Sequence, residues 1–83
     1  MKARVHVFYK DSVFDPQGNT IAASLRRVGF QKVKDVRVGR SIDVELEAVS
    51  WEEAKLSLEK MCEKLLVNPV IESFRLEKIE EKR

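Results

Sequence analysis

The chain has few side chains that could carry out covalent or acid–base chemistry. It contains one histidine, His6, and one cysteine, Cys62. Nucleophilic catalysis needs a nucleophile, a base and an orienting group held together. His6 lies inside an alternating strand, and Cys62 lies late on the apolar side of a helix, where a thiol behaves as a small buried hydrophobe. We therefore expect no catalytic residue and no zinc site of the usual Cys/His composition.

Charged residues are plentiful, but their pattern does not indicate a binding site for metal, nucleic acid or membrane. Asp43, Glu45 and Glu47 share one face of a strand, which is typical of a solvated sheet face or a polar subunit contact. Sixteen basic and fourteen acidic side chains give a net charge of +2, with the two signs interleaved. The strands also lack the aromatic, glycine-rich motif on which RNA recognition modules stack bases.

The tetrapeptide Asp15-Pro16-Gln17-Gly18 is the most informative local feature of the sequence. Asp15 suits the N-cap of a helix, and Pro16 suits the first helical position because its φ is preset. Gln17 and Gly18 are not needed for a helix start, since glycine early in a helix costs about 1 kcal/mol relative to alanine. We therefore expect these two residues to serve a contact or a fixed backbone geometry.

Hydrophobic periodicity predicts the elements that must position this tetrapeptide. Residues 4–10 alternate as a strand, and the helix after Pro16 ends at Gly29. The period returns to two from residue 33 to 47, and Gly39-Arg40-Ser41 indicates a tight hairpin between two antiparallel strands. The apolar face of the helix is spaced i, i+1, i+4, i+7: Ile21, Ala22, Leu25 and Val28.

A second amphipathic helix and a closing strand follow. Ser50 and Glu53 form a capping box, and Asn68-Pro69 ends the helix. The last strand, about residues 70–79, has apolar residues on both faces, so we expect a second layer such as another subunit to cover it. The apolar stripe of the helix is Trp51, Ala54, Leu58, Met61 and Leu65.

The order β-α-β-β-α-β is the split βαβ, or ferredoxin-like, arrangement. It predicts an α+β two-layer sandwich, with an antiparallel sheet, two helices on one face, and the other face packed in an oligomer. The 83 residues make one domain, 1–83, which buries only about 60–65% of its unfolded surface and is often completed by a partner. The single cysteine and the absence of a long apolar stretch favour the cytoplasm.

Four segments, in this order and spacing, resemble the PurS family, the small subunits of phosphoribosylformylglycinamidine synthase. The resemblance covers nearly the full length. It departs at Phe14, where an aliphatic residue is usual, and at Arg40, where the family commonly has a lysine and a planar donor fork now replaces a compact ammonium. The segments are Val13-Phe14-Asp15-Pro16-Gln17-Gly18, Leu25 to Gly29, Val36-Arg37-Val38-Gly39-Arg40 and Asn68-Pro69-Val70-Ile71-Glu72.

The resemblance implies a role in the fourth step of purine synthesis. In the family's three-part enzyme, a glutaminase subunit releases ammonia, and a large subunit uses ATP and magnesium to activate formylglycinamide ribonucleotide. The small subunit supplies no catalytic side chain and binds no cofactor alone. It is implied to be a dimer that bridges the other two subunits and supports ammonia transfer, and a tetramer stays open. We expect the partner-facing or structurally fixed surface to comprise Asp15, Pro16, Gln17, Gly18, Gly39 and Arg40.

Two other functional classes stay open from the residues alone. The same element order serves ACT-like regulatory domains, which bind an amino acid or another metabolite at a subunit interface. It also serves stand-alone enzymes, because this architecture hosts many unrelated functions. A ligand-dependent rise in melting temperature across a metabolite panel would favour the first class. Turnover by the purified chain without partners would favour the second.

Overall fold

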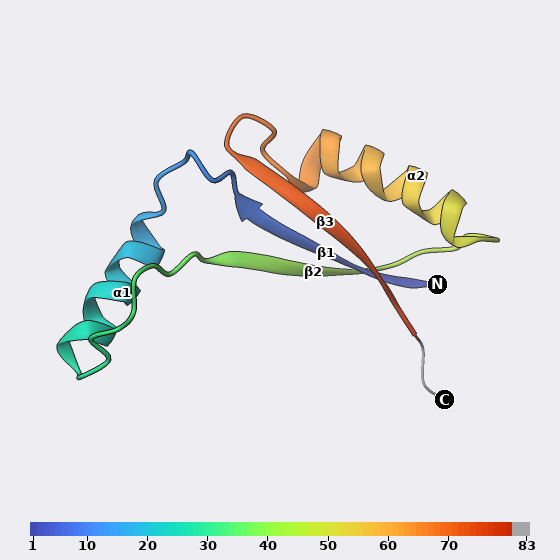
Figure 1. Ribbon diagram of the computed structural model, residues 1–83. Helices are drawn as coiled ribbons and strands as arrows, with labels where there is room; N and C mark the ends of the chain where they lie inside the picture. The colour runs from blue at the N-terminus through green and yellow to red at the C-terminus, as the bar shows by residue number, and fades with distance from the viewer. Residues whose placement is uncertain (81–83) are drawn as a thin grey trace.

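The computed structural model describes residues 1–80, and its central element is a three-stranded antiparallel sheet (Figure 1). β1 (Lys2–Tyr9) is the middle strand, with β2 (Gly39–Glu45) on one side and β3 (Glu72–Ile79) on the other. The α+β class and the antiparallel sheet predicted from the sequence are confirmed. No helix within residues 1–80 has the length and apolar content needed to cross a membrane.

The register places apolar side chains of all three strands on one face of the sheet. Val5 pairs with Ile42 on β2 and with Leu76 on β3. Helix α2 (Trp51–Met61) covers this face, and its Leu58 is fully buried, which contributes about 1.5–3 kcal/mol. The core also contains the buried residues Ala3, Val5, Val7, Ala54, Cys62 and Val67.

Helix α2 begins and ends with local hydrogen bonds that set which side chains are buried. The Glu53 amide donates to Ser50 Oγ at 3.2 Å, so Ser50 is the N-cap and the Ser50 half of the predicted capping box forms. A π-helical turn, η1 (Cys62–Leu66), extends the helix, and the Val67 amide donates to the Cys62 carbonyl at 3.1 Å. The wider turn rotates the helical face. Leu65 is therefore 84% exposed, and its prediction as a core residue is wrong.

The predicted hairpin at Gly39-Arg40-Ser41 is wrong, because these residues form the start of β2. Gly39 pairs with Phe8, and Ser41 pairs with His6. A two-residue hairpin turn needs positive φ, and Gly29 is the one described residue with positive φ. Residues 33–38 therefore precede β2 and extend its line beyond the end of the sheet. The sheet of residues 1–80 has three strands and not the predicted four.

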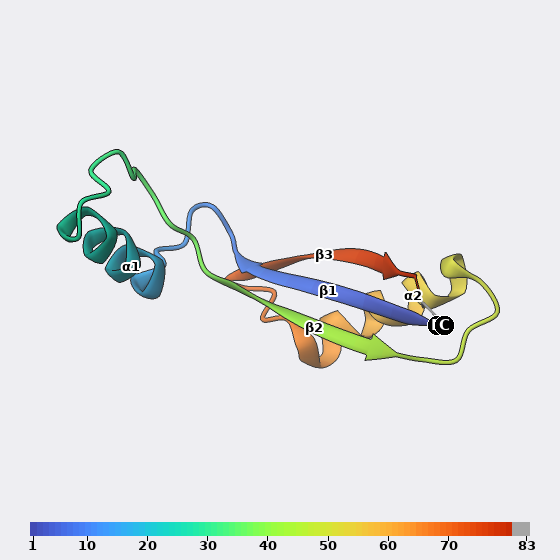
Figure 2. The same ribbon diagram turned by 90° about the horizontal axis from the view of Figure 1, so that it is seen from below.

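Helix α1 (Pro16–Arg27) lies beyond the ends of the strands and does not cover the sheet (Figures 1 and 2). The prediction of two helices on one face of the sheet is therefore wrong for the single chain, since α2 alone covers it. The straight path of residues 33–38 is the reason, because it leads away from the sheet. Gly29, with φ of 115°, follows the end of α1 as predicted.

The separation of α1 from the sheet makes the chain more open than a compact protein of its size. Its radius of gyration is 16.2 Å, whereas about 12 Å is expected for 83 compact residues. Its accessible surface is 6545 Å², compared with about 5100 Å² for a compact monomer of this mass. The excess of about 1400 Å² is larger than the share of surface that one partner buries in a standard protein interface.

Candidate functional site

The predicted site residues gather where the sheet joins a projecting unit, residues 10–38, which we call the arm. The arm consists of α1 and the two segments that connect it to β1 and β2 (Figure 1). The rest of the described chain, the sheet with α2 and η1, is called the body. The tetrapeptide that begins α1 and the glycine that begins β2 both lie at this junction.

Asp15 ties the two connecting segments of the arm together. Its side chain is 98% buried, since only 2% of the residue is exposed. Oδ1 accepts from the Gly18 amide at 2.8 Å, which caps α1, and Oδ2 accepts from the Val38 amide at 2.7 Å. The Val38 bond, then the Gly18 bond, hold the pKa of Asp15 below its usual value, and the charge of Arg37 acts in the same direction.

Gly18 is required by a close approach of two backbone segments. A Cβ atom at this position would lie 2.1 Å from the Val36 carbonyl oxygen, far inside ordinary contact. Pro16 occupies the first turn of α1, as its position in the tetrapeptide predicted. The tetrapeptide therefore does more than start a helix: it holds α1 against the segment that leads into β2.

Two arginines that were not predicted as site residues hold the arm together, Arg37 at the junction and Arg26 at the far end of α1. The Arg37 Nη2 group donates to the Lys10 carbonyl at 3.1 Å and to the Val13 carbonyl at 2.8 Å. Arg26 donates from Nε to the Val33 carbonyl at 2.9 Å and from Nη2 to the next carbonyl at 2.9 Å. No local pattern in the sequence marks either arginine as a donor to distant carbonyls.

Gly39 and Arg40 connect the arm to the body. A Cβ at Gly39 would lie 2.5 Å from the Val7 carbonyl oxygen, so only glycine fits between these strands. The Arg40 guanidinium binds both carboxylate oxygens of Glu72, at 2.6 and 3.1 Å, and donates to the Leu66 carbonyl at 2.7 Å. This bidentate pair lowers the pKa of Glu72 and raises that of Arg40.

Gln17 is the predicted residue that these contacts leave unexplained. It is exposed, and its side chain makes no hydrogen bond within residues 1–80. Gln17, Gly39 and Arg40 line a shallow pocket of about 160 Å³ together with Tyr9 and Glu72. The structure thus brings these three predicted residues together. Gln17 is the one among them whose side-chain amide has no hydrogen bond to the described part of the chain, so both of its polar atoms are available to a partner.

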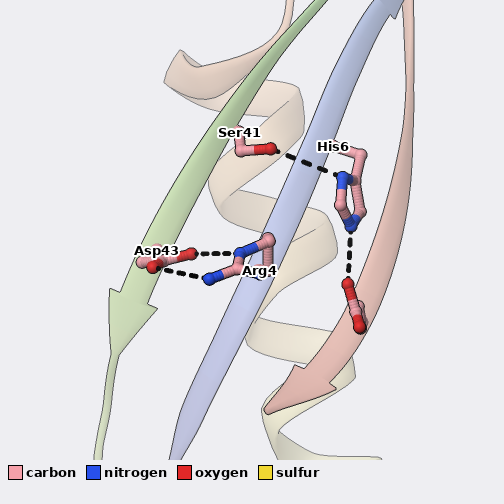
Figure 3. A network of polar contacts seen from close by, with 5 residues as sticks. Arg4, His6, Ser41 and Asp43 are labelled. Carbon is pink, nitrogen blue, oxygen red and sulfur yellow. Dashed lines mark hydrogen bonds and ion pairs between the residues drawn. The ribbon is translucent and has the colours of Figure 1, made fainter.

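The sheet face opposite α2 carries a separate polar network (Figure 3). Arg4 forms a bidentate pair with Asp43, at 2.8 and 3.2 Å, and this pair lowers the pKa of Asp43. His6 Nε2 lies 2.7 Å from Glu77 Oε1, and this bond lowers the pKa of Glu77. The Ser41 hydroxyl lies 3.5 Å from His6 Nδ1. His6 and Asp43 therefore each pair with a charged residue on the sheet face that α2 does not cover.

Cys62 is fully buried in the core at the end of α2. Desolvation raises the pKa of its thiol above the usual value, and the charge of Glu59 acts in the same direction. A raised pKa disfavours the thiolate, which is the reactive form of cysteine. Cys62 thus packs as a small apolar residue, as its place in the sequence predicted.

These features define a small α+β chain of ferredoxin-like class whose distinctive residues build a junction between the arm and the body. The chain belongs to the PurS family: residues 2–80 match the family model described as phosphoribosylformylglycinamidine (FGAM) synthase, PurS. The PurS subunit of Methanocaldococcus jannaschii is 42% identical over 81 residues, covering 95% of this chain and 98% of that one. The PurS subunit of Bacillus subtilis is 40% identical over 76 residues, covering 92% of this chain and 89% of that one.

Solved structures agree with this assignment. The PurS subunit of Thermotoga maritima superimposes with a TM-score of 0.85 at 41% identity, covering 94% of this chain and 90% of that chain. A chain in the structure of PurLQS from the same organism also superimposes with a TM-score of 0.85 at 41% identity, covering 94% and 95%.

Proposed function

We propose that this chain is the small, non-catalytic subunit of an FGAM synthase complex, a ligase of purine biosynthesis. The observation that carries the proposal is its 41% identity and TM-score of 0.85 with a chain of the PurLQS complex. The chain would bridge a large synthase subunit and a glutaminase subunit. An ACT-like regulatory role has no comparable support.

The chemistry of the complex explains why a subunit without catalytic groups is useful. The glutaminase subunit hydrolyses glutamine to glutamate and ammonia. The large subunit uses ATP and magnesium to activate the amide oxygen of formylglycinamide ribonucleotide, and ammonia then displaces phosphate to form the amidine. This chain holds no ATP or magnesium itself. As part of the proposal, it acts in the cytoplasm as one domain that keeps the two active sites joined, so that ammonia passes between them.

The arm and the body supply complementary surfaces for a homodimer. The arm carries large apolar side chains that are exposed in the single chain: Ile21 on α1, and Val28 and Phe30 just after it. The body carries an apolar groove of about 560 Å³ beside α2, lined by Val44, Met61 and other residues of β2, α2 and η1. Seating the arm of one copy in the groove of the other would cover both surfaces, which supports a dimer with exchanged arms.

The edge of the sheet supports the same arrangement. Among residues 1–80, β2 has a neighbour on one side only, so its other edge is unpaired there. Residues 33–38 keep the alternating pattern that predicted a strand, and they lie outside the sheet of their own chain. Pairing this segment with β2 of a partner would build the predicted four-stranded sheet with two helices, but from two chains. The apolar side chains of residues 33–38 would then be buried by the partner chain.

A test of the bridging role uses the cognate large and glutaminase subunits with glutamine present. Sedimentation velocity should show the large and glutaminase subunits sedimenting together only when this chain is added. Gln17→Ala should weaken that complex, whereas Asn19→Ala, an exposed amide substitution on the same helix, should not. Equal association of the two larger subunits with and without the chain would contradict the proposal.

A further inference from the structure

The orientation of the arm is a choice that the hydrophobic pattern leaves open. In a closed monomer, the chain would reverse at 39–41, residues 33–38 would pair with β2, and α1 would cover the groove beside α2. In the open chain, residues 33–38 continue straight from β2 and carry α1 away. Both arrangements bury the same apolar surfaces, one within a chain and the other between two chains. Contacts at the junction must therefore decide between them.

Three contacts join the outgoing segment of the arm, residues 10–18, to the returning segment, residues 36–38. Asp15 Oδ2 accepts from the Val38 amide at 2.7 Å. Arg37 donates to two carbonyls of the outgoing segment, at 3.1 and 2.8 Å. The Gly18 backbone lies against the Val36 carbonyl so closely that no Cβ fits. All three hold the returning segment beside the start of α1.

These contacts are incompatible with a closed monomer. A reversal at 39–41 would turn residues 36–38 back along the edge of β2, where their amides and carbonyls would bond to that strand. The Val38 amide would then lie away from Asp15, and the buried carboxylate would lose its second partner. A buried carboxylate without its hydrogen bonds is strongly unfavourable, so forming these contacts favours the open arm.

We propose that Asp15, Gly18 and Arg37 form a brace that holds the arm open and thereby selects the dimer with exchanged arms over a closed monomer. The inference rests on the proposed homodimer and assigns to it a positioning residue, Asp15. Asp15 is suited to this role because its buried carboxylate accepts two charge-assisted hydrogen bonds. One comes from Gly18 at the start of α1, and the other comes from Val38 in the returning segment.

The sharpest test is Asp15→Asn in the full chain. Asparagine has the same shape, but it offers one acceptor oxygen and one NH2 donor, so one of the two backbone amides would face a donor. Asp11→Asn is the matched control, because Asp11 is an exposed residue of the same segment and its replacement makes the same change in charge. Sedimentation equilibrium measures the monomer–dimer dissociation constant of each protein, and circular dichroism reports whether the body stays folded.

We expect Asp15→Asn to raise the dimer dissociation constant at least about tenfold, with the circular dichroism spectrum unchanged and Asp11→Asn like the parent. The monomer it releases should have a radius of gyration by X-ray scattering closer to about 12 Å than to 16.2 Å. A folded Asp15→Asn protein with the parent's dissociation constant overturns the brace. If Asp15→Asn fails to fold, Arg37→Met gives the same test, since it removes two exposed hydrogen bonds and no buried group. A parent chain that is itself monomeric would instead overturn the homodimer.

Discussion

Replacement of Gly18 by alanine sets two effects against each other, and their magnitudes decide the outcome. Gly18 lies in the first turn of α1, where alanine would gain up to about 1 kcal/mol in helix propensity. By sequence rules alone, the substitution should stabilise the protein. The structure predicts the opposite, because of what lies next to this position.

A Cβ at Gly18 would lie 2.1 Å from the Val36 carbonyl oxygen and 2.9 Å from the Val36 carbonyl carbon. It would also lie 2.8 Å from Asp15 Oδ2. Ordinary contact begins at 3.4 Å, so the returning backbone would have to move by more than 1 Å and would stretch the bond between Asp15 and Val38. Overpacking of this kind costs about 1–3 kcal/mol, and the backbone cannot relax as a flexible side chain would. We place Gly18→Ala at the upper end, for a net loss of about 2 kcal/mol.

Thermal denaturation of Gly18→Ala checks this prediction, with Asn19→Ala as the control. A loss of 1 kcal/mol lowers the melting temperature of a domain of this size by about 4–8 °C, so Gly18→Ala should melt roughly 8–16 °C below the parent. Asn19 is exposed on the same turn, and its replacement should leave the melting temperature unchanged or slightly raised. A Gly18→Ala protein that melts at or above the parent's temperature would refute the reasoning.

Three further predictions concern the body. Leu58→Ala removes a fully buried side chain and should lower the free energy of unfolding in urea by about 2–5 kcal/mol. A loss under about 1 kcal/mol would contradict the burial of Leu58 in the core. Because the pKa of Glu72 is lowered below its usual 4.5 in the folded state, its pairing with Arg40 stabilises the protein above about pH 4.5, and this contribution is lost as the pH falls through the folded pKa. Glu72→Gln should therefore flatten the acid limb of the stability curve, and an unchanged limb would contradict the pair. Cys62 should react slowly with a thiol reagent in the folded protein and quickly after unfolding; fast reaction of the folded protein would contradict its burial.

Local signals in the sequence identified the elements but not all of their pairings. The caps at Asp15 and Ser50 and the positive φ at Gly29 depend on residues within one turn, so they were predictable. The pairing of residues 33–38 was not, because an alternating pattern shows that a strand has an apolar face and does not show which chain supplies its neighbour. A hairpin at Gly39 was predicted because it pairs the two alternating segments within one chain. The structure shows instead that this glycine permits the close approach of Val7 on β1.

The candidate site was predictable to a similar extent. The tetrapeptide stood out because Gln17 and Gly18 exceed what a helix start requires, and Gly18 does have a special backbone position. The bond from Asp15 to Val38 spans 23 residues, and the contacts of Arg37 span 24 and 27. Contacts between residues so far apart in the chain produce no local or periodic pattern from which they could be predicted in a single sequence. The exposure of Leu65 was missed because the π-helical turn that causes it has no clear local signature.

The measurement that tests the bridging role most directly is FGAM synthesis by the cognate large and glutaminase subunits, with this chain present and absent. Each mixture is supplied with ATP, magnesium and formylglycinamide ribonucleotide, and either glutamine or ammonium is given as the nitrogen source. We expect synthesis from glutamine to require the chain, whereas synthesis from ammonium should persist without it. Equal rates with glutamine in the presence and absence of the chain would contradict the account.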